Sequence, residues 1–386
     1  SAQDAGDPIR AFLEGAAEVD LAPAPLPDNP RAMWVVRDGI LSPAMIRAMF
    51  DDATEAGITD IFLQVRGRGD AYYPSQLAPT GPPLADAWRR RGAFDPLALS
   101  IELARERGIR LHAWLNVYLV QSGSRIPAGH VLEAHPDWAA VDPQGTPMTQ
   151  MGERRMKAEW TEGAYLEPGN PEVVRHFVQI VEELVANYPL DGIHLDYVRY
   201  PEMNVGYSPE MRSGFARRTG IDPLELEANK SGLIRERGQA GYDALVLEWN
   251  RFKSDQVTAL VTQVRRTLKR TQPHILLSAA VKPSLSSARR VGQDWMSWLN
   301  EGLIDIAAPM LYATERGVVQ RQAEAIAKLV PAEQVWGGIG VYNKSVRAAE
   351  RDVLACQDAG LGGVSIFSYN SLPGGGATLT RLSRAR

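Results

Sequence analysis

The sequence predicts an α/β fold in which eight parallel strands close into a (β/α)8 TIM barrel, with long loops after strands two, three and four. Short segments rich in β-branched and aromatic residues alternate with amphipathic helices, as in parallel α/β proteins. Eight such segments favour closure. A doubly wound sheet, the alternative, would need a glycine-rich turn after its first strand, and 36–40 holds none. The expected strands are Ala32–Arg37, Asp60–Val65, Arg110–Tyr118, Gly192–Val198, Ile275–Val281, Ile304–Tyr312, Val335–Tyr342 and Gly363–Tyr369.

The helices between these strands have clear start and stop signals. A polar residue followed by proline is typical of a helix N-cap and first helical position, and glycine is typical just after a helix. The starts are Ser42-Pro43, Asp95-Pro96 and Asn170-Pro171, and the stops are Gly57, Gly108 and Gly360.

Three connections are much longer than the rest: Gly67–Phe94, Leu119–Gly169 and Arg199–Gly241. Each follows a strand, so all three should rise at the C-terminal end of the barrel. Loops of this length in a compact domain are usually functional. We therefore expect one barrel domain over 31–386, with its site beside strands two to four.

Composition narrows the classes of function. The 386 residues are 45% hydrophobic and 23% charged, with a net charge of −4. That charge provides no basic field for nucleic acid, so no nucleic-acid partner is expected. No apolar run approaches the length of a transmembrane segment. The single cysteine, Cys356, excludes a disulfide within the chain. The oligomeric state is not predicted.

The first thirty residues lack regular pattern, and 22–30 contains four prolines. We interpret 1–30 as an extension or tether ahead of the folded body. The chain begins at Ser1 rather than Met, which suggests a removed export signal or a sequence taken from a longer one. We expect an exported protein, periplasmic or in the cell envelope, in which the N-terminal extension could serve as a tether.

The segment Asp191–Pro201 is the most informative in the chain. Side chains alternate across a strand, so His194 and Asp196 should share one face against apolar Ile193 and Leu195. A buried carboxylate is costly unless it is hydrogen-bonded or used. Catalytic groups of TIM barrels sit at the C-terminal ends of strands. A structural role in capping the next loop is the alternative.

The same alternation places polar groups at the C-terminal ends of other strands, where they could partner one another or a ligand. Aromatic residues crowd the same end, and such rings are suited to stacking on sugars. The polar sets are Gln64 with Arg66, His112 with Asn116 and Tyr118, Ser278 with Lys282, and Met310 with Tyr312; the aromatic residues include Tyr73, Trp138, Trp160 and Tyr369.

Three chemistries are compatible with a barrel of this kind. A metal hydrolase would need clustered ligands, and the six histidines form no His-x-His pair. A phosphate-binding barrel would place glycines after strands seven and eight, whereas Gly337-Gly338 and Gly362-Gly363 lie within or before them. A glycoside hydrolase needs two carboxyl groups across the scissile bond. We expect no metal and no cofactor.

Asp196 is the best-placed nucleophile. Several loop residues are candidates for the second carboxyl. Glu167 ends the loop before the helix that leads to strand four. Glu315 follows strand six, and Asp70 follows strand two.

These residues resemble a family of bacterial glycosyl-hydrolase-like TIM barrels that includes the divisome-localised peptidoglycan glycosidase. The similarity runs from about residue 31 to residue 372. The matching segments are 33–35, 64–73, 112–116, 135–138, 165–173, 191–201 and 367–369.

The resemblance implies export and action on a glycan, with peptidoglycan strands as the leading substrate. Two departures matter: the family usually has Asp-Asp where this chain has Asp196-Tyr197, and Asn where it has Glu167. The change at 197 removes one carboxylate from the expected site, and that at 167 adds one nearby.

We therefore predict a retaining glycosidase with Asp196 as nucleophile and Glu315 or Glu167 as acid/base, its pKa raised by burial. A non-catalytic glycan-binding barrel of the cell envelope is the alternative. The predicted substrate-binding residues are Arg66, Asp70, Tyr73, Asn116, Tyr118, Trp138, His194, Arg199, Lys282, Tyr312 and Tyr369.

Overall fold

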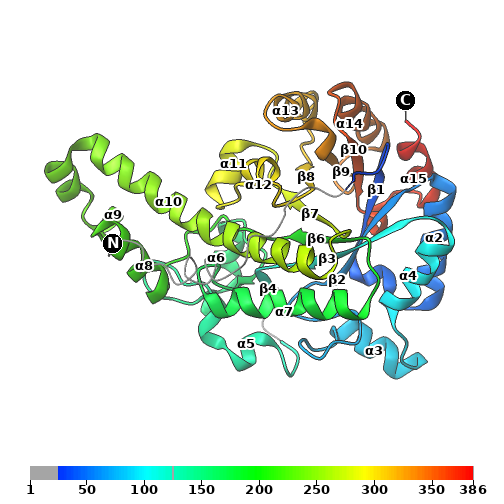
Figure 1. Cartoon of the computed structure of the whole chain (residues 1–386), viewed down its shortest axis with the longest axis horizontal. Coiled ribbons are helices and arrows are strands. Elements are labelled where there is room, and N and C mark those ends of the chain that lie inside the picture. The colour runs from blue at the N-terminus through cyan, green and yellow to red at the C-terminus, as the bar shows by residue number, and fades with distance from the viewer. Residues whose placement is uncertain (1–24, 124–125, 386) are drawn as a thin grey trace.

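A computed structural model describes residues 25–123 and 126–385. It confirms the predicted fold: eight parallel strands close into a barrel in the order β1-β10-β9-β8-β7-β6-β3-β2, with helices outside (Figure 1). The expected 1–30 extension falls mostly outside the described residues. The strands are β1 Arg31–Val35, β2 Asp60–Arg66, β3 Arg110–Asn116, β6 Gly192–Asp196, β7 Leu276–Val281, β8 Ile306–Leu311, β9 Trp336–Gly340 and β10 Gly363–Phe367.

The helices begin where the capping residues predict. Ser42, Asp95 and Asn170 each accept a hydrogen bond from a backbone N–H of the first turn. Gly57 ends the first long helix in the left-handed region, with φ 69°. The helices are α2 Pro43–Ala56, α3 Pro82–Arg91, α4 Pro96–Glu106, α5 Val131–Ala134, α6 Glu153–Ala158, α7 Pro171–Asn187, α8 Pro209–Thr219, α9 Glu225–Ala228, α10 Lys230–Thr271, α11 Leu285–Arg290, α12 Trp295–Asn300, α13 Val318–Ala327, α14 Val346–Asp358 and α15 Gly376–Ser383.

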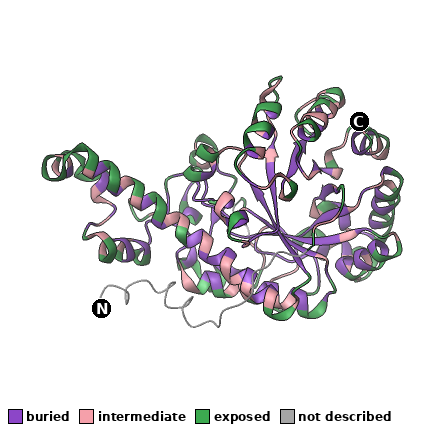
Figure 2. Cartoon of the chain, turned by 45° about the horizontal axis from the view of Figure 1, so that its top comes forward, coloured by how far each residue is buried: buried purple, intermediate pink, exposed green. Residues whose placement is uncertain are grey.

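The three long loops carry secondary structure of their own. The loop after β2 contains α3. The loop after β3 contains α5, α6 and a small two-stranded antiparallel sheet of β4 Leu119–Gln121 and β5 Ala164–Tyr165. The loop after β6 forms α8 and α9, and together with the first part of α10 it projects from the body (Figures 1 and 2). Gly238, at φ 74°, divides α10 into two helical segments.

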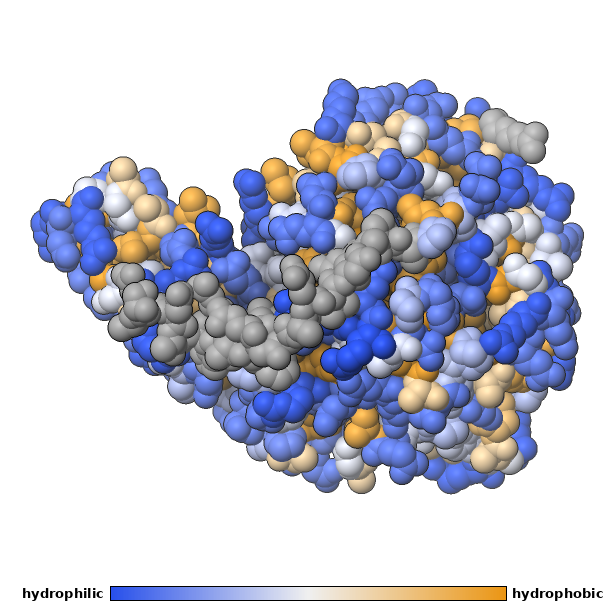
Figure 3. Space-filling view, in the orientation of Figure 1, coloured by the Kyte–Doolittle hydropathy of each residue, from blue (hydrophilic) through white to orange (hydrophobic). Residues whose placement is uncertain are grey.

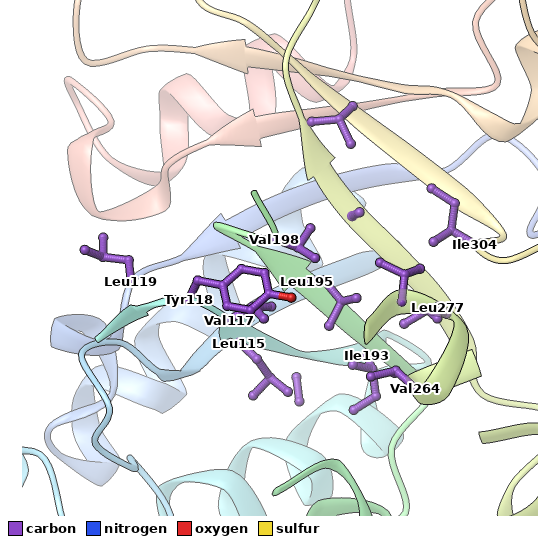
Figure 4. Packing of buried hydrophobic residues seen from close by; sticks show 14 of the residues in the cluster. Leu115, Val117, Tyr118, Leu119, Ile193, Leu195, Val198, Val264, Leu277 and Ile304 are labelled. Carbon is purple, nitrogen blue, oxygen red and sulfur yellow. The ribbon is translucent and has the colours of Figure 1, made fainter. Parts of the chain in front are cut away.

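Two apolar layers lie on either side of the strands. The outer layer packs strands against helices and includes Leu195, Val198 and Val264 (Figure 4). The inner layer fills the barrel with large rings and aliphatic side chains, and the strands are buried on both faces (Figure 2). The inner residues are Ala32, Trp34, Phe62, Trp114, Leu276, Ile306, Ala308 and Trp336.

Buried ion pairs stand at the N-terminal ends of the strands. Asp60 in β2 accepts hydrogen bonds from Arg110 at 2.6 and 2.7 Å and pairs with His112 at 2.9 Å. Arg265 of α10 donates to both carboxylate oxygens of Asp305 at 2.8 and 2.6 Å. These four charged side chains fix strand starts and neighbouring helices to one another.

Hydrophilic residues cover most of the face in Figure 3, and a notch separates the projecting arm from the body. Among the described residues, none of the helices combines the length and apolar character needed to cross a bilayer.

Candidate active site

Asp196 lies at the C-terminal end of β6, directly opposite Asn116 at the end of β3. Its backbone carbonyl accepts a hydrogen bond from the N–H of Val117 at 2.8 Å, which joins the two strand ends. The residue is 9% exposed, whereas His194 one layer deeper is fully buried. Asp196 therefore lies at the mouth end of the barrel, one layer above His194, with a small part of its surface exposed.

Both carboxylate oxygens of Asp196 accept hydrogen bonds. Trp114 Nε1 donates to Oδ2 at 3.1 Å, and the backbone N–H of Tyr197 donates to Oδ1 at 2.7 Å. Burial raises the pKa of Asp196 to about 6, while Arg199 and these two donors oppose the rise. Asp196 is therefore mostly ionised near neutral pH, with its lone pairs held in a fixed direction.

The chain turns sharply after Asp196. Tyr197 has φ 50°, a left-handed conformation that bulky residues rarely adopt. The turn brings the Arg199 guanidinium over the Tyr197 ring, 4.9 Å from its centroid. Arg199 Nη1 also donates to Tyr165 Oη and to the Tyr200 carbonyl, both at 3.3 Å. Strained backbone of this kind clusters at functional sites, because the surrounding structure must hold it.

A second carboxyl near Asp196 is Glu162, which the sequence reasoning did not select. Glu162 is exposed, and its Oε2 accepts a hydrogen bond from Tyr165 Oη at 3.4 Å. Tyr165 links it to the site: its hydroxyl accepts a hydrogen bond from Arg199, and its ring meets that of Tyr197 with centroids 6.1 Å apart. Burial chiefly, and the charge of Glu162 to a lesser degree, raise the pKa of Asp196 and of Tyr197. The sequence does contain one signal that this segment belongs to the site: the neighbouring Trp160 is a tryptophan in a polar loop.

Aromatic rings form the wall of the mouth on the β8 to β10 side. Tyr312 stacks on Phe367 with ring centroids 5.3 Å apart. Burial, and next the charge of Asp196, raise the pKa of Tyr312 well above its usual value, so its hydroxyl stays protonated beside the carboxylate. Lys282, at the end of β7, is paired with Glu202 at 2.6 Å.

A chain of polar side chains approaches Asp196 from the other side. Asn116 donates to the Gly67 carbonyl at 2.8 Å and accepts from Gln64 at 3.3 Å. Arg37 Nη1 donates to Gln64 Oε1 at 2.8 Å. The sequence predicted Asn116 and not Arg37: the expected first strand runs to Arg37, whereas β1 ends at Val35 and Arg37 begins the turn that follows.

His194 shares the inward face with Asp196, as expected, but lies in the barrel core. Its Nε2 accepts a hydrogen bond from Trp34 Nε1 at 2.9 Å, and Nδ1 pairs with Ser278 Oγ at 2.8 Å. The ring stacks on Phe62 at 4.0 Å. Burial lowers its pKa well below the usual value, so it is a neutral part of the floor beneath the site.

Two residues expected on the inward face point elsewhere, so this expectation from alternation is wrong. The register shifts between Gln64 and Arg66, which places Arg66 opposite Leu115 on the outer face. β3 ends at Asn116, and Tyr118 packs in the outer layer beside Leu195 and Val198 (Figure 4). Alternation fails in both cases because the regular strand has ended or bulged.

Four other predicted binding residues hold loops or helices in place. Asp70 Oδ1 accepts from the backbone N–H groups of Gly67 and Arg68, at 3.2 and 2.7 Å. Tyr73 donates to Glu183 at 3.0 Å, and Tyr369 donates to Asp52 at 2.9 Å. Trp138 is 8% exposed and stacks on His135 at 3.9 Å. The structure brings none of these four against Asp196.

Glu167 is buried in the outer layer, at 1% exposure. Its Oε1 accepts from Tyr200 Oη at 2.9 Å and from the N–H of Gly169 at 3.4 Å. Oε2 and Tyr118 Oη are both buried without a hydrogen-bond partner among the described residues. Burial raises the pKa of Glu167 to about 7, against the opposing effect of Tyr200.

Glu315 lies in the loop between β8 and α13, where its side chain is exposed. Like Glu162, it lacks the burial expected of a proton donor; Glu167 has that burial but packs behind the strand ends. In the described ranges, no three His, Cys, Asp or Glu side chains converge as metal ligands do.

Solved structures of glycosidases share the fold. The catalytic domain of β-amylase from Paenibacillus polymyxa superposes with a TM-score of 0.60 at 10% identity, over 93% of this chain and 99% of that one. The β-galactosidase from the psychrophilic Marinomonas ef1 gives a TM-score of 0.58 at 12% identity, over 92% and 59%. Likeness at such low identity shows the fold alone.

Comparison of the sequence finds curated relatives and a matching family model. Glycosyl hydrolase YngK of Bacillus subtilis (strain 168) is 26% identical over 286 residues, or 68% of this chain and 48% of that protein. Glycosyl hydrolase DigH of Escherichia coli (strain K12) is 26% identical over 294 residues, or 68% and 56%. An S-layer-related protein of Niallia circulans is 25% identical over 57% of this chain and 14% of its own length.

The chain thus spans about half the length of the first two relatives. The family model described as "Glycosyl hydrolase-like 10" matches residues 30–353, which is most of the chain. The protein belongs to the glycosyl hydrolase-like 10 family.

Proposed function

We propose that this protein hydrolyses glycosidic bonds of a glycan, with Asp196 as the catalytic carboxylate. One observation carries the proposal: the Asp196 carboxylate stands at the C-terminal mouth of the barrel with a donor on each oxygen, in a residue that keeps 9% of its surface exposed. TIM-barrel enzymes place their reacting groups at that end. Membership of a glycosyl-hydrolase-like family supports the reaction class.

The proposed mechanism is retaining. Asp196 attacks the anomeric carbon as the glycosidic bond breaks, and the leaving oxygen takes a proton from a second carboxyl. That carboxyl then removes a proton from water, which cleaves the glycosyl-Asp196 ester and restores both groups. Glu162 is the favoured acid/base, because Tyr165 Oη joins it to Arg199, the cation beside Asp196. Glu167 and Glu315, expected from the sequence, remain the alternatives.

The surrounding side chains supply binding and orientation in this proposal. Arg199 favours the ionised form of Asp196. Tyr312 and Asn116 present polar groups beside it, and Tyr197 contributes a half-buried ring. Lys282 is held by Glu202 and would contact a sugar further from the reacting carbon.

The proposed substrate is the glycan strand of peptidoglycan or a related envelope polysaccharide, and the proposed location is outside the cytoplasm. The sequence resemblance described above supports both. The S-layer-related relative fits a protein of the cell surface.

The test is digestion of purified peptidoglycan glycan strands by the parent protein and by Asp196→Asn, with products separated by size. We expect Asp196→Asn to lose cleavage by a factor on the order of 10³ or more while still binding the strands. Cleavage unchanged in Asp196→Asn would overturn the assignment. Equal binding with no cleavage by either protein would favour the non-catalytic glycan-binding barrel.

The acid/base is identified by comparing Glu162→Gln, Glu167→Gln and Glu315→Gln on the same strands. We expect the large loss in Glu162→Gln, and rescue of that variant by azide is typical of a retaining enzyme's acid/base. NMR of the first product tests stereochemistry: retained anomeric configuration is expected, and inversion would contradict the mechanism.

A further inference from the structure

Exposed aromatic side chains are scarce in this protein. In the part of the chain that the structure describes, two are exposed: Trp160 at 85% and Tyr342 at 55%. A large apolar ring that stays in water loses the stabilisation that burial would give, about 25 cal/mol for each Å² of apolar surface. Single exposed rings are ordinary on protein surfaces, so the position of these two decides whether they have a use.

Trp160 stands beside the acidic side of the mouth. It lies two residues before Glu162, which accepts a hydrogen bond from Tyr165, and the Tyr165 ring meets Tyr197, the residue after Asp196, with centroids 6.1 Å apart. It has φ 52°, a left-handed conformation unusual for a bulky residue. The segment leads into β5, whose partner strand β4 continues from β3, the neighbour of β6 in the barrel.

Tyr342 stands at the far side of the same mouth. It follows β9, which is separated from β6 by β8 and β7 in the barrel order. Its ring meets Tyr312 edge-on at 5.9 Å and Phe367 at 6.0 Å. The Phe367 ring in turn meets Trp114, the donor to Asp196 Oδ2, with centroids 6.2 Å apart. The two exposed rings thus flank Asp196 from opposite sides.

We infer that Trp160 and Tyr342 are stacking platforms for sugar rings on opposite sides of Asp196, so that the site takes an internal segment of a long glycan chain. Flat rings with polar edges match the apolar faces and equatorial hydroxyls of pyranoses. A site with platforms on both sides cuts within a chain rather than releasing end sugars. This inference rests on the proposed glycosidase function.

The test measures glycan affinity as a function of chain length, by calorimetry, in the Asp196→Asn background so that the ligand survives. The probes are disaccharide and octasaccharide fragments of peptidoglycan glycan strands. We expect the octasaccharide to bind more tightly, and Trp160→Ala or Tyr342→Ala to weaken that binding by about tenfold each, the factor of one stacked ring. Trp160→Phe and Tyr342→Phe should restore most of the affinity.

Leu329→Ala is the matched control. Leu329 is also exposed, at 54%, but lies between α13 and β9 at the N-terminal end of the barrel. It should leave octasaccharide binding unchanged. All three alanine variants alter exposed side chains, so each is expected to fold.

Two further readouts complete the test. In the Asp196→Asn background, the octasaccharide should protect Trp160 from acrylamide quenching of fluorescence. With the catalytically competent protein, the early products of long strands should be of intermediate size. If the parent cleaves glycans but the two alanine variants bind like Leu329→Ala, or if early products are terminal sugars, the inference fails while the glycosidase proposal stands. If the parent neither binds nor cleaves strands of any length, both fail.

Discussion

At the N-terminal end of the barrel, Asp60 is hydrogen-bonded to Arg110 and His112, whereas at the C-terminal end Asp196 is held by the neutral donors Trp114 and the Tyr197 backbone. These contacts lower the pKa of Asp60 although burial opposes them, while burial raises the pKa of Asp196 to about 6. The buried carboxylate at the N-terminal end of the barrel is thus neutralised by cations and serves stability. The carboxylate at the C-terminal end lacks such an ion pair and keeps a shifted pKa, as catalytic groups do.

The largest effect should come from breaking a compensated pair. Arg265→Met leaves Asp305 buried without its bidentate partner, which typically costs about 3–5 kcal/mol. Urea unfolding gives the free energy of unfolding directly. Arg289→Met, on the exposed side of α11, is the control and should change stability by less than about 0.5 kcal/mol. Arg265→Met with Asp305→Leu should recover most of the loss; a single variant as stable as the parent would contradict this reading.

The opposite effect on the free energy of unfolding is expected for a substitution of Asp196. The pKa of Asp196 is raised from 3.8 to about 6, so ionisation destabilises the folded state by up to about 3 kcal/mol above pH 6. Asp196→Asn should therefore stabilise the protein at pH 8, and the gain should disappear below about pH 4, where the parent carboxyl is protonated in both states.

Asp60→Asn is the matched comparison, and it should behave in reverse. The folded pKa of Asp60 is lowered, so its stabilisation is present above the unfolded pKa and fades as pH falls through the folded one. Unfolding free energies of the two Asn variants, measured from pH 4 to pH 8, should diverge in sign at pH 8. If both variants destabilise equally at that pH, the contrast between the two ends is wrong.

A smaller effect is expected at Glu167. Tyr200→Phe removes the hydroxyl that donates to Glu167 Oε1, at a typical cost of about 1–2 kcal/mol. Because the lost donor stabilised the charged form, the pKa of Glu167 should rise above about 7. The loss should thus be larger at pH 8.5 than at pH 5.5. Tyr342→Phe, at an exposed hydroxyl, should leave the unfolding free energy unchanged at both pH values.

The smallest effect is a shift in the pH profile of cleavage. The nucleophile must be ionised, so kcat/KM should rise through about pH 6. Arg199 favours that ionised form, and Arg199→Met should move the midpoint upward by roughly half a pH unit to one. Arg290→Met, which removes an exposed charge, should leave the midpoint in place. An unmoved midpoint in Arg199→Met would show that another group sets the acid limb.

Most of the fold could be predicted from the sequence, because its signals are local. Proline after Ser42, Asp95 and Asn170 marks helix starts, and β-branched runs mark strands. The signals that end a strand are less local. The expected strand 110–118 stops at Asn116, and the chain continues into β4, which pairs with β5.

The site was only partly predictable for the same reason. Asp196 lies within a regular strand, where alternation holds to the last residue. Arg66 follows a register shift that no residue type announces, so its side chain leaves the expected face. Glu162 joins the site through Tyr165 and Arg199, contacts that spacing in the sequence does not encode.

The floor of the barrel has a consequence for how the protein exchanges small molecules. Trp34, Phe62, His194 and Trp336 fill the cross-section beneath Asp196 with rings that are 1% exposed or less. In the proposed enzyme, substrate and both product fragments would then all use the C-terminal face. Each fragment would compete with fresh substrate for the site there, and turnover in a concentrated digest would slow by competitive product inhibition.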